Sequence, residues 1–291
     1  MQSISHPIGE IFFKPGEPLL KMWEVRVLPD HRPFSRHSHT RFEISLIVSG
    51  TGEYTTENRV YPMQPGDVFV FASGEAHCIT RVCPPGIQLI NLHFEPRYLM
   101  EHRESESFAD FCFSHSPDFE NRIPAALASD LAEFHTCLQN EFRQALPDYP
   151  TAIRAYLDLL LLSLIRNHGY QSSLQPGNNN LSPMLQVFRY IEEHLTEKLT
   201  LEQLASVAGL SPNYFSHLFK QLNGLSLWDY ITAKRVELAV LRILSPNSDL
   251  TVLEIALLCG FNNPVSFNRA FKKFKGVTPS ELKKNPKLLS H

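Results

Sequence analysis

The segment 251–276, TVLEIALLCGFNNPVSFNRAFKKFKG, has the same pattern as an earlier segment, 200–224, TLEQLASVAGLSPNYFSHLFKQLNG. In both, a threonine is followed by an alanine, a glycine and two phenylalanines at matching positions. Equivalent positions are 51 residues apart up to the glycine and 52 apart after it, so one residue has been added in the middle of the second copy. Such a repeat indicates one supersecondary unit used twice.

Each copy predicts a short helix, a tight turn and a second helix. Thr200 with Gln203, and Thr251 with Glu254, have the spacing of capping boxes. The glycine that follows each short helix suits a left-handed helix end, and Ser-Pro or Asn-Pro then opens the second helix. Apolar residues recur every three or four positions along that helix, which leaves its opposite, polar face exposed. This arrangement is typical of helix-turn-helix units that bind the DNA major groove.

Residues 226–244, between the two copies, predict one long helix. It would be a rigid spacer between the two units, since successive major-groove faces lie about 34 Å apart. Over about residues 183–284, the arrangement resembles the DNA-binding domain of the AraC/XylS family of bacterial transcription regulators. The stretch 255–282, IALLCGFNNPVSFNRAFKKFKGVTPSEL, is similar to the signature of that family. A helical bundle with accidental turns is the alternative.

The resemblance implies which side chains contact bases, and the periodicity agrees because they lie off the phenylalanine faces. These residues are Asn213, Ser216, His217, Asn263, Ser266 and Arg269. Arg269 is the strongest candidate because a guanidinium can make a bidentate contact to guanine. Ser216 and Asn263 could equally be polar residues of the helix surface that do not contact bases. The lysines expected either at phosphates or as solvated helix ends are Lys220, Lys272, Lys273 and Lys275.

The charge of the chain is unevenly distributed. At 291 residues the length suggests two domains. Residues 1–181 have 14 basic and 21 acidic side chains, whereas residues 182–291 have 13 basic and 9 acidic ones. The repeat therefore lies in the positively charged part of the chain, as attraction to DNA phosphates requires. Five scattered cysteines indicate free thiols in a reducing compartment. With no signal peptide and no apolar segment of membrane-spanning length, we expect a cytoplasmic protein without membrane contact.

The N-terminal half predicts strands. Short β-prone runs between about residues 20 and 94 are separated by glycine- and proline-rich turns, which favours a barrel or sandwich. Helices are expected at 125–146 and 151–167. The second belongs to a stretch whose leucines would lie on nearly every face of the helix, which suits burial between this domain and a second subunit. The polar segment 171–180 is typical of a linker.

One group of polar residues in this half has a recognisable spacing. His37, His39 and Glu43 lie at i, i+2 and i+6, so an extended strand directs all three to one face. With Gly50 they resemble the first cupin motif. A second motif is similar but degraded, since Ala72 replaces its usual proline and Arg81 its usual asparagine; it ends at His77.

In metal-binding cupins, the residues that match His37, His39, Glu43 and His77 are the ligands. Three imidazoles and a carboxylate suit a divalent transition metal, Mn, Fe, Ni or Zn. The other interpretations are that these residues line a pocket for the effector, or that they only connect strands by hydrogen bonds. His93, a single histidine on its strand, is expected to be an ordinary hydrogen-bonded strand residue.

We therefore expect a multi-domain α and β protein: an N-terminal cupin-like β-barrel plus helices, and a C-terminal all-α domain with two helix-turn-helix motifs. The domain division that we predict is a cupin-like effector-sensing domain at 1–115, a helical dimerisation or connector region at 116–170, a linker at 171–181 and an AraC-type DNA-binding domain with two helix-turn-helix units at 182–291.

The resemblance implies a homodimeric transcription regulator that is not an enzyme. Its partners would be promoter DNA, a small effector, best guessed as a carbohydrate or related metabolite, and RNA polymerase if it activates. Two alternatives stay open: a metal- or redox-sensing regulator, and a cupin metalloenzyme fused to a DNA-binding domain.

Overall fold

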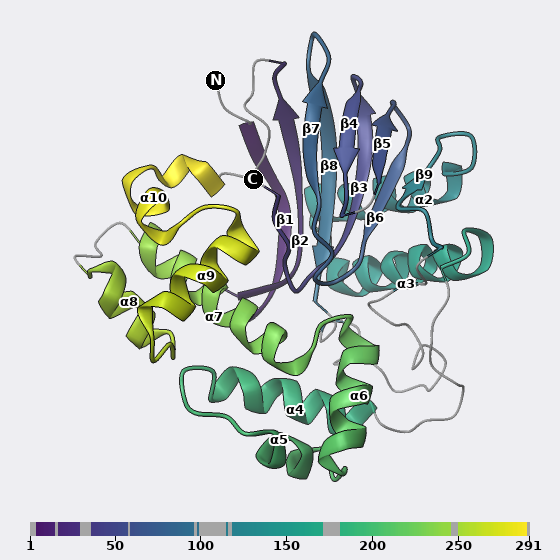
Figure 1. The fold of residues 1–291 in the computed structure, drawn as a ribbon. Coiled ribbons are helices and arrows are strands. Elements are labelled where there is room, and N and C mark those ends of the chain that lie inside the picture. The colour runs from purple at the N-terminus through teal and green to yellow at the C-terminus, as the bar shows by residue number, and fades with distance from the viewer. Residues whose placement is uncertain are drawn as a thin grey trace.

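Strands form the first part of the chain and helices form the rest, as the sequence predicts (Figure 1). In this computed structural model the described residues are 4–14, 17–29, 36–57, 59–95, 98, 115, 118–170, 181–245 and 250–289. The predicted linker lies outside them, except Leu181, which begins a helix.

The N-terminal part has two antiparallel sheets. The larger has the strand order β1-β2-β8-β3-β6-β9 and the smaller β5-β4-β7. The strands are β1 (Ile4–Lys14), β2 (Glu17–Val27), β3 (Phe42–Ser49), β4 (Gly52–Thr55), β5 (Val60–Met63), β6 (Val68–Phe71), β7 (Cys78–Val82), β8 (Ile87–Phe94) and β9 (Arg122–Ile123). Side chains from both sheets, including Tyr54, Phe69, Phe71 and Leu89, pack into one interior cluster. This is the cupin-like barrel that the sequence predicts.

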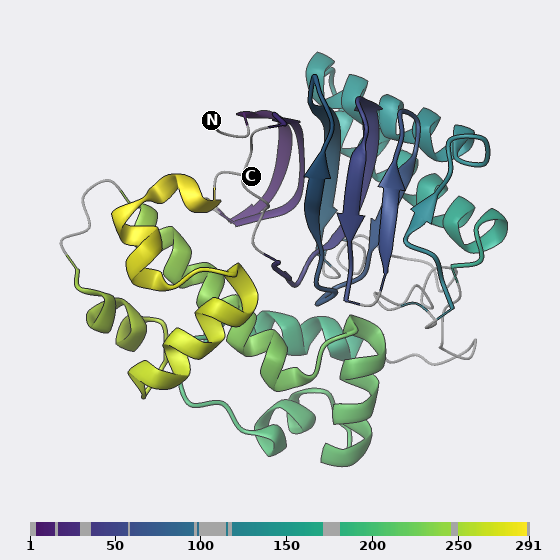
Figure 2. The same ribbon diagram turned by 45° about the horizontal axis from the view of Figure 1, so that its top comes forward.

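Two helices cover the outer face of the larger sheet, α2 (Ser129–Gln144) and α3 (Tyr149–Asn167) (Figure 2). Side chains alternate across a strand, so Phe42 and Ile44 of β3 pack against these helices while Glu43 lies on the opposite face, towards the interior. Most of the apolar surface of α3 is buried against this core, and Leu159 remains 45% exposed. The core of its own domain therefore covers most of α3, and its contact with a second subunit stays a prediction.

The C-terminal part is helical, with two cores. Its elements are α4 (Leu181–Glu193), α5 (Leu201–Val207), α6 (Pro212–Asn223), α7 (Leu227–Leu244), α8 (Val252–Leu258), α9 (Pro264–Lys275), α10 (Pro279–Lys284) and the 3-10 helix η2 (Pro286–Leu289). The first half of α7 packs in one core with α4, α5 and α6, and its second half packs in the other with α8, α9 and α10. Helix α7 thus joins the two helix-turn-helix units.

The local signals of the repeat are observed as predicted. Thr200 and Thr251 form capping boxes, and a third begins at Thr278. Gly209 and Gly260 have φ angles of 65° and 82°, the left-handed conformation that ends the first helix of each unit. None of the described helices is both long enough and apolar enough to span a bilayer.

Helix α2 places one titratable side chain, His135, in the core between the helices and the sheet. It is 1% exposed, and burial lowers its pKa to about 4. The unfolded chain, in which a histidine has a pKa of about 6.5, therefore binds more protons between pH 6.5 and 4. Folding stability must fall as the pH is lowered through this window.

We expect this histidine to contribute a loss of about 3 kcal/mol in the free energy of unfolding between pH 7 and pH 4. His135→Leu should remove that contribution, so the variant should lose less stability over the same range. Urea unfolding at several pH values measures the difference, with His6→Leu at an exposed position of β1 as the control. Parallel pH profiles for wild type and His135→Leu would contradict the prediction.

Candidate functional site

A buried carboxylate, Glu43, lies at the centre of a group of histidines inside the β domain. Its Oε2 atom is 3.0 Å from His39 Nε2, 3.2 Å from His77 Nε2 and 2.5 Å from His93 Nε2. The other oxygen, Oε1, accepts a hydrogen bond of 2.8 Å from Ser45 Oγ. We call Glu43, His37, His39, His77 and His93 the histidine cluster.

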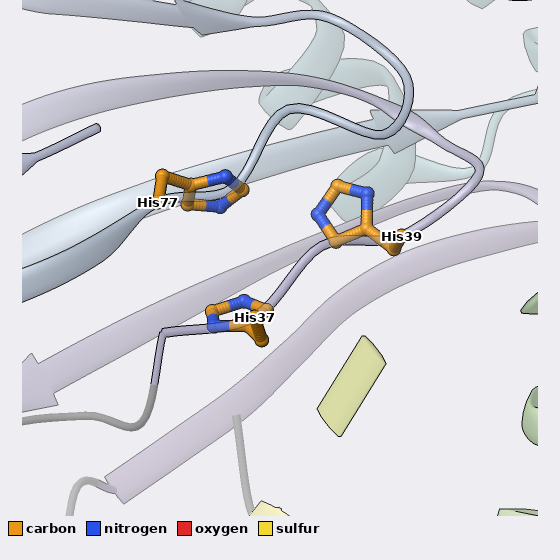
Figure 3. Close-up of side chains that lie close together, drawn as sticks. All are labelled: His37, His39 and His77. Carbon is orange, nitrogen blue, oxygen red and sulfur yellow. The ribbon is translucent and has the colours of Figure 1, made fainter. Parts of the chain in front are cut away.

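Backbone pairing brings these residues together from distant parts of the sequence. Glu43 of β3 lies opposite His93 of β8 in the antiparallel register. His37 and His77 form an isolated bridge through two backbone hydrogen bonds, 3.3 Å and 3.1 Å long. Figure 3 shows His37, His39 and His77 gathered in one place; the ring centroid of His77 is 4.8 Å from that of His37 and 5.4 Å from that of His39.

His93 is a hydrogen-bonded strand residue as expected, but its partner is Glu43, so it belongs to the histidine cluster, which the sequence analysis did not predict. The sequence did contain a signal for it. Asn91 and His93 alternate with apolar residues along β8, so their two side chains lie on the same face of the strand. Both line the interior cavity next to Glu43.

The protonation of the histidine cluster follows from burial and from Glu43. Burial alone would raise the pKa of Glu43. The electrostatic effects of His93 and His77, together with hydrogen bonds from His39 and His77, instead hold this pKa well below its ordinary value. Burial lowers the pKa values of His39 and His93, whereas for His77 the charge of Glu43 outweighs burial and raises the pKa. The ionised form of the carboxylate is therefore favoured, while burial works against the charged forms of His39 and His93.

The donor atoms of the histidine cluster fit a transition metal. The ligand atoms of His37, His39 and His77 lie within 4.8 Å of one another, and so do those of His39, Glu43 and His93. Neutral imidazole is the form of histidine that binds metals, and imidazoles with a carboxylate suit Zn, Fe, Ni or Mn. These residues could therefore hold such an ion.

A small cavity of about 50 Å³ adjoins the histidine cluster. Its lining includes the apolar side chains of Val25, Ile79 and Leu89 as well as Trp23 and Asn91. Among the described residues, the buried indole N–H of Trp23 has no hydrogen-bond partner. An unpaired buried donor is costly, so a ligand atom that accepts a hydrogen bond would be favoured here.

The second candidate site is the exposed side of α6 and α9. Asn213, Ser216 and His217 are exposed on α6, whereas Phe215, Leu218 and Phe219 are buried on its other side. On α9, Ser266 and Arg269 are exposed, and Asn263 caps the helix by accepting a hydrogen bond of 2.7 Å from Val265 N. All six residues predicted to contact bases are therefore at the surface.

The flanking lysines differ in their surroundings. Lys220 and Lys272 are exposed, and the exposed Lys273 forms an ion pair of 2.5 Å with Asp229. Lys275 at the end of α9 is partly buried, in the electrostatic field of Glu237 and Arg41. The expectation that Lys275 contacts phosphate does not fit this arrangement.

Comparisons with known proteins agree for both parts of the chain. Residues 28–161 match the model of the AraC-like ligand binding domain, and residues 204–285 match that of a helix-turn-helix domain. The TetD protein of transposon Tn10 from Escherichia coli is 38% identical over 99 residues, which cover 34% of this chain and 70% of TetD. The chain belongs to the AraC family of transcriptional regulators.

Other known proteins are similar to the chain over different lengths. The arabinose operon regulatory protein of Escherichia coli is 27% identical over 256 residues, covering 82% of this chain and 79% of that protein. The probable transcriptional regulator LumQ of Photobacterium leiognathi is 36% identical over 97 residues, and the chain spans only 38% of its length. The structure of ToxT from Vibrio cholerae shares the two-domain fold, with a TM-score of 0.61 at 13% identity over 94% of this chain and 99% of ToxT.

We expect Arg269→Ala to relax base preference at one position of the bound DNA. The lost bidentate contact corresponds to about 1–3 kcal/mol of discrimination. Competition binding against single-base variants of a duplex selected from a random pool measures it. The control is Asn268→Ala, an exposed neighbour on α9. An equal loss of affinity for all DNA sequences would instead indicate that Arg269 contacts a phosphate.

Replacing Lys272 and Lys273 together by alanine should reduce the salt dependence of DNA binding without changing base preference. Each phosphate contact adds about 0.9 to the slope of log K against log salt, so the slope should fall by up to about 2. The control removes two positive charges from the β domain, Arg59→Ala with Arg81→Ala. If the slope of the lysine variant stays at the wild-type value, these lysines lie away from DNA.

Proposed function

We propose that this AraC-family regulator binds promoter DNA through α6 and α9 and responds to a small effector held at the histidine cluster. The observation that supports DNA binding most directly is the pair of exposed polar helix faces, each opposite a buried phenylalanine face. Both belong to cores that share α7. This is the arrangement expected of two units that enter successive major grooves.

A carbohydrate or related metabolite is our first proposal for the effector. The sugar named in the arabinose operon regulatory protein supports it, because that relative is similar over most of both chains. The cavity of about 50 Å³ is much smaller than the roughly 300–1,000 Å³ of ordinary ligand pockets, so a sugar requires the cavity to widen. A ToxT structure with a similar fold has an unsaturated fatty acid bound.

A divalent transition metal is the second candidate, and the donor set of the histidine cluster favours it. An ion fits the cavity as it stands. The protein would then be a metal- or redox-sensing regulator. Membership of a family of transcriptional regulators favours a protein that is not an enzyme over a cupin metalloenzyme.

The remaining partners follow from the same proposal. The protein acts in the cytoplasm as a homodimer, and it contacts RNA polymerase if it activates transcription. Paired half-sites on promoter DNA commonly mirror the two-fold symmetry of a dimer.

The experiment compares wild type with the double variant His37→Ala, His39→Ala. Purified full-length protein is analysed for bound metal with and without chelator, and its affinity for the selected duplex is measured with Zn²⁺ and with a panel of pentoses and hexoses. We expect the double variant to lose the response while still binding DNA, because the C-terminal part has its own cores. His6→Ala is the control.

The outcomes separate the candidates. Metal retained by wild type and lost from the double variant supports the metal sensor. A sugar response lost without any bound metal supports the carbohydrate pocket. A double variant that responds as wild type does would show that the effector binds elsewhere and that the histidine cluster is structural.

A further inference from the structure

Besides sharing α7, the two helix-turn-helix units touch each other directly, where the loop before α5 meets the turn before α9. The first unit comprises α5 and α6 and the second α8 and α9, and Figures 1 and 2 show them towards opposite ends of α7. Among the described residues, their apolar cores have no member in common. A direct contact between the units therefore affects how α6 and α9 are placed relative to each other.

Arg235 makes one part of this contact. It lies in the second half of α7, between Ala233 and Val236 of the second core. Its Nε donates a hydrogen bond of 2.8 Å to the carbonyl of Leu195, and its Nη2 donates one of 2.6 Å to the carbonyl of Glu197. Hydrogen bonds from charged donors are stronger than those between neutral groups. The guanidinium thus connects the loop between α4 and α5 to the half of α7 that packs with the second unit.

The loop that Arg235 contacts is itself fixed to the first unit. Leu195 and Leu199 pack with the first core. Thr200, at the end of the loop, forms the capping box of α5. A displacement of this loop would therefore move α5 and, through the shared core, α6.

The turn of the second unit makes the other part of the contact. A Cβ atom on Gly260 would lie 2.9 Å from the carbonyl oxygen of Thr196 and 3.0 Å from Arg235 Nε. A side chain at this position would therefore require the loop of the first unit to move. Three residues after Gly260, Asn263 caps α9, so this contact also fixes the start of α9.

The repeat provides an internal comparison for Gly260. Gly209 is the equivalent residue of the first unit and has the same left-handed conformation, with a φ angle of 65° against 82°. Beyond its chain neighbours, no described atom lies within 4 Å of the place that a Cβ on Gly209 would take. Glycine at 209 is thus needed for its backbone conformation alone, whereas glycine at 260 also permits a close approach of the two units.

A cavity adjoins the contact between the units. It has a volume of about 130 Å³, and its lining includes Thr196 and Lys198 from the first unit's loop, Trp228 of α7 and Asn262 from the turn of the second unit. Close packing is what ordinarily fixes neighbouring parts of a protein. Because packed side chains do not fill this space, the hydrogen bonds of Arg235 and the approach of Gly260 determine the distance across it.

We propose that Arg235 and Gly260 form a brace that sets the spacing between α6 and α9, and with it the number of base pairs that the protein accepts between the two DNA elements it contacts. The inference rests on the proposed function, because it requires both helices to enter major grooves. One added base pair shifts the second element by about 3.4 Å along the duplex and about 35° around it. A rigid pair of units discriminates against that shift, whereas a loosely joined pair can follow it.

The test measures the affinity of the full chain for a duplex selected from a random pool and for the same duplex with one base pair inserted between the two elements. For wild type the insertion should lower the affinity by about 10- to 100-fold, the size of the loss at a mismatched position. Arg235→Met keeps a long side chain but has no donor. It should reduce this ratio of affinities by about 5- to 10-fold, as expected for the loss of one or two hydrogen bonds. Base preference within each element should not change, which distinguishes a loosened brace from an unfolded unit.

Three further variants control this result. Gly260→Ala should reduce the ratio as Arg235→Met does, because its Cβ displaces the loop. Gly209→Ala introduces the same left-handed strain and should destabilise the protein to a similar extent, but should keep the wild-type ratio. Lys198→Met removes a positive charge at an exposed position beside the cavity and should weaken binding to both duplexes equally.

A measurement without DNA tests the brace by itself. Spin labels on Glu202 and Leu253, which are exposed and occupy equivalent positions on α5 and α8, report the distance between the units. Unnatural amino acids can hold these labels, which leaves the native cysteines in place. We expect a broader distribution of distances in Arg235→Met than in wild type, and the wild-type distribution in Gly209→Ala.

The outcomes distinguish the brace from the proposed function. Wild-type ratios for both Arg235→Met and Gly260→Ala would overturn the proposal, as would an unchanged distance distribution in Arg235→Met. If the wild type itself tolerates the inserted base pair or selects a single element, the proposed entry of both helices into DNA is wrong, and the role in spacing is wrong with it. The label distances would then still show whether the brace holds the two units together.

Discussion

Helix α7 has to satisfy three packing surfaces at once. Its first half contributes Tyr230 and Ile231 to one helix-turn-helix core, and its second half contributes Val236 and Ala239 to the other. Between them the β domain contacts it through Lys234. Because protein interiors are close-packed, a rotation of α7 that suits its packing against one of these partners would disturb its packing against the other two. The spacing of α6 and α9 and the position of the β domain are consequently linked through a single helix.

The protein contains two buried polar clusters that differ in kind. The histidine cluster combines one carboxylate with imidazoles, and burial lowers the pKa values of two of them, His39 and His93. The other cluster, at the boundary between the domains, combines full charges that compensate one another: Arg41, Glu95, Lys234 and Glu237. Buried ion pairs add little net stability compared with apolar packing but can specify one arrangement.

The sequence predicted what is determined locally and missed what depends on long-range register. Capping at Thr251, the left-handed Gly260 and the buried face of α9 each depend on residues a few positions apart, and all are observed. The contact of His93 with Glu43 joins positions 50 residues apart through the pairing of β3 and β8. The environment of Lys275 depends on how one domain docks on another, which no local pattern encodes.

The geometry of the histidine cluster also limits what can occupy it. Any ligand must replace the hydrogen bonds that Glu43 already makes to three imidazoles, so its net affinity is what remains after those bonds are broken. A divalent cation compensates the carboxylate and uses the same imidazole nitrogens with little movement. A sugar must supply a hydroxyl for each lost partner and must also widen a cavity of about 50 Å³. The wider opening would displace residues that line the cavity, among them His37, which lies four residues from Arg41 at the domain boundary. Of the two candidates, the larger ligand therefore has the greater mechanical effect on the interdomain contact, and the ion has the better fit to the cluster as it stands.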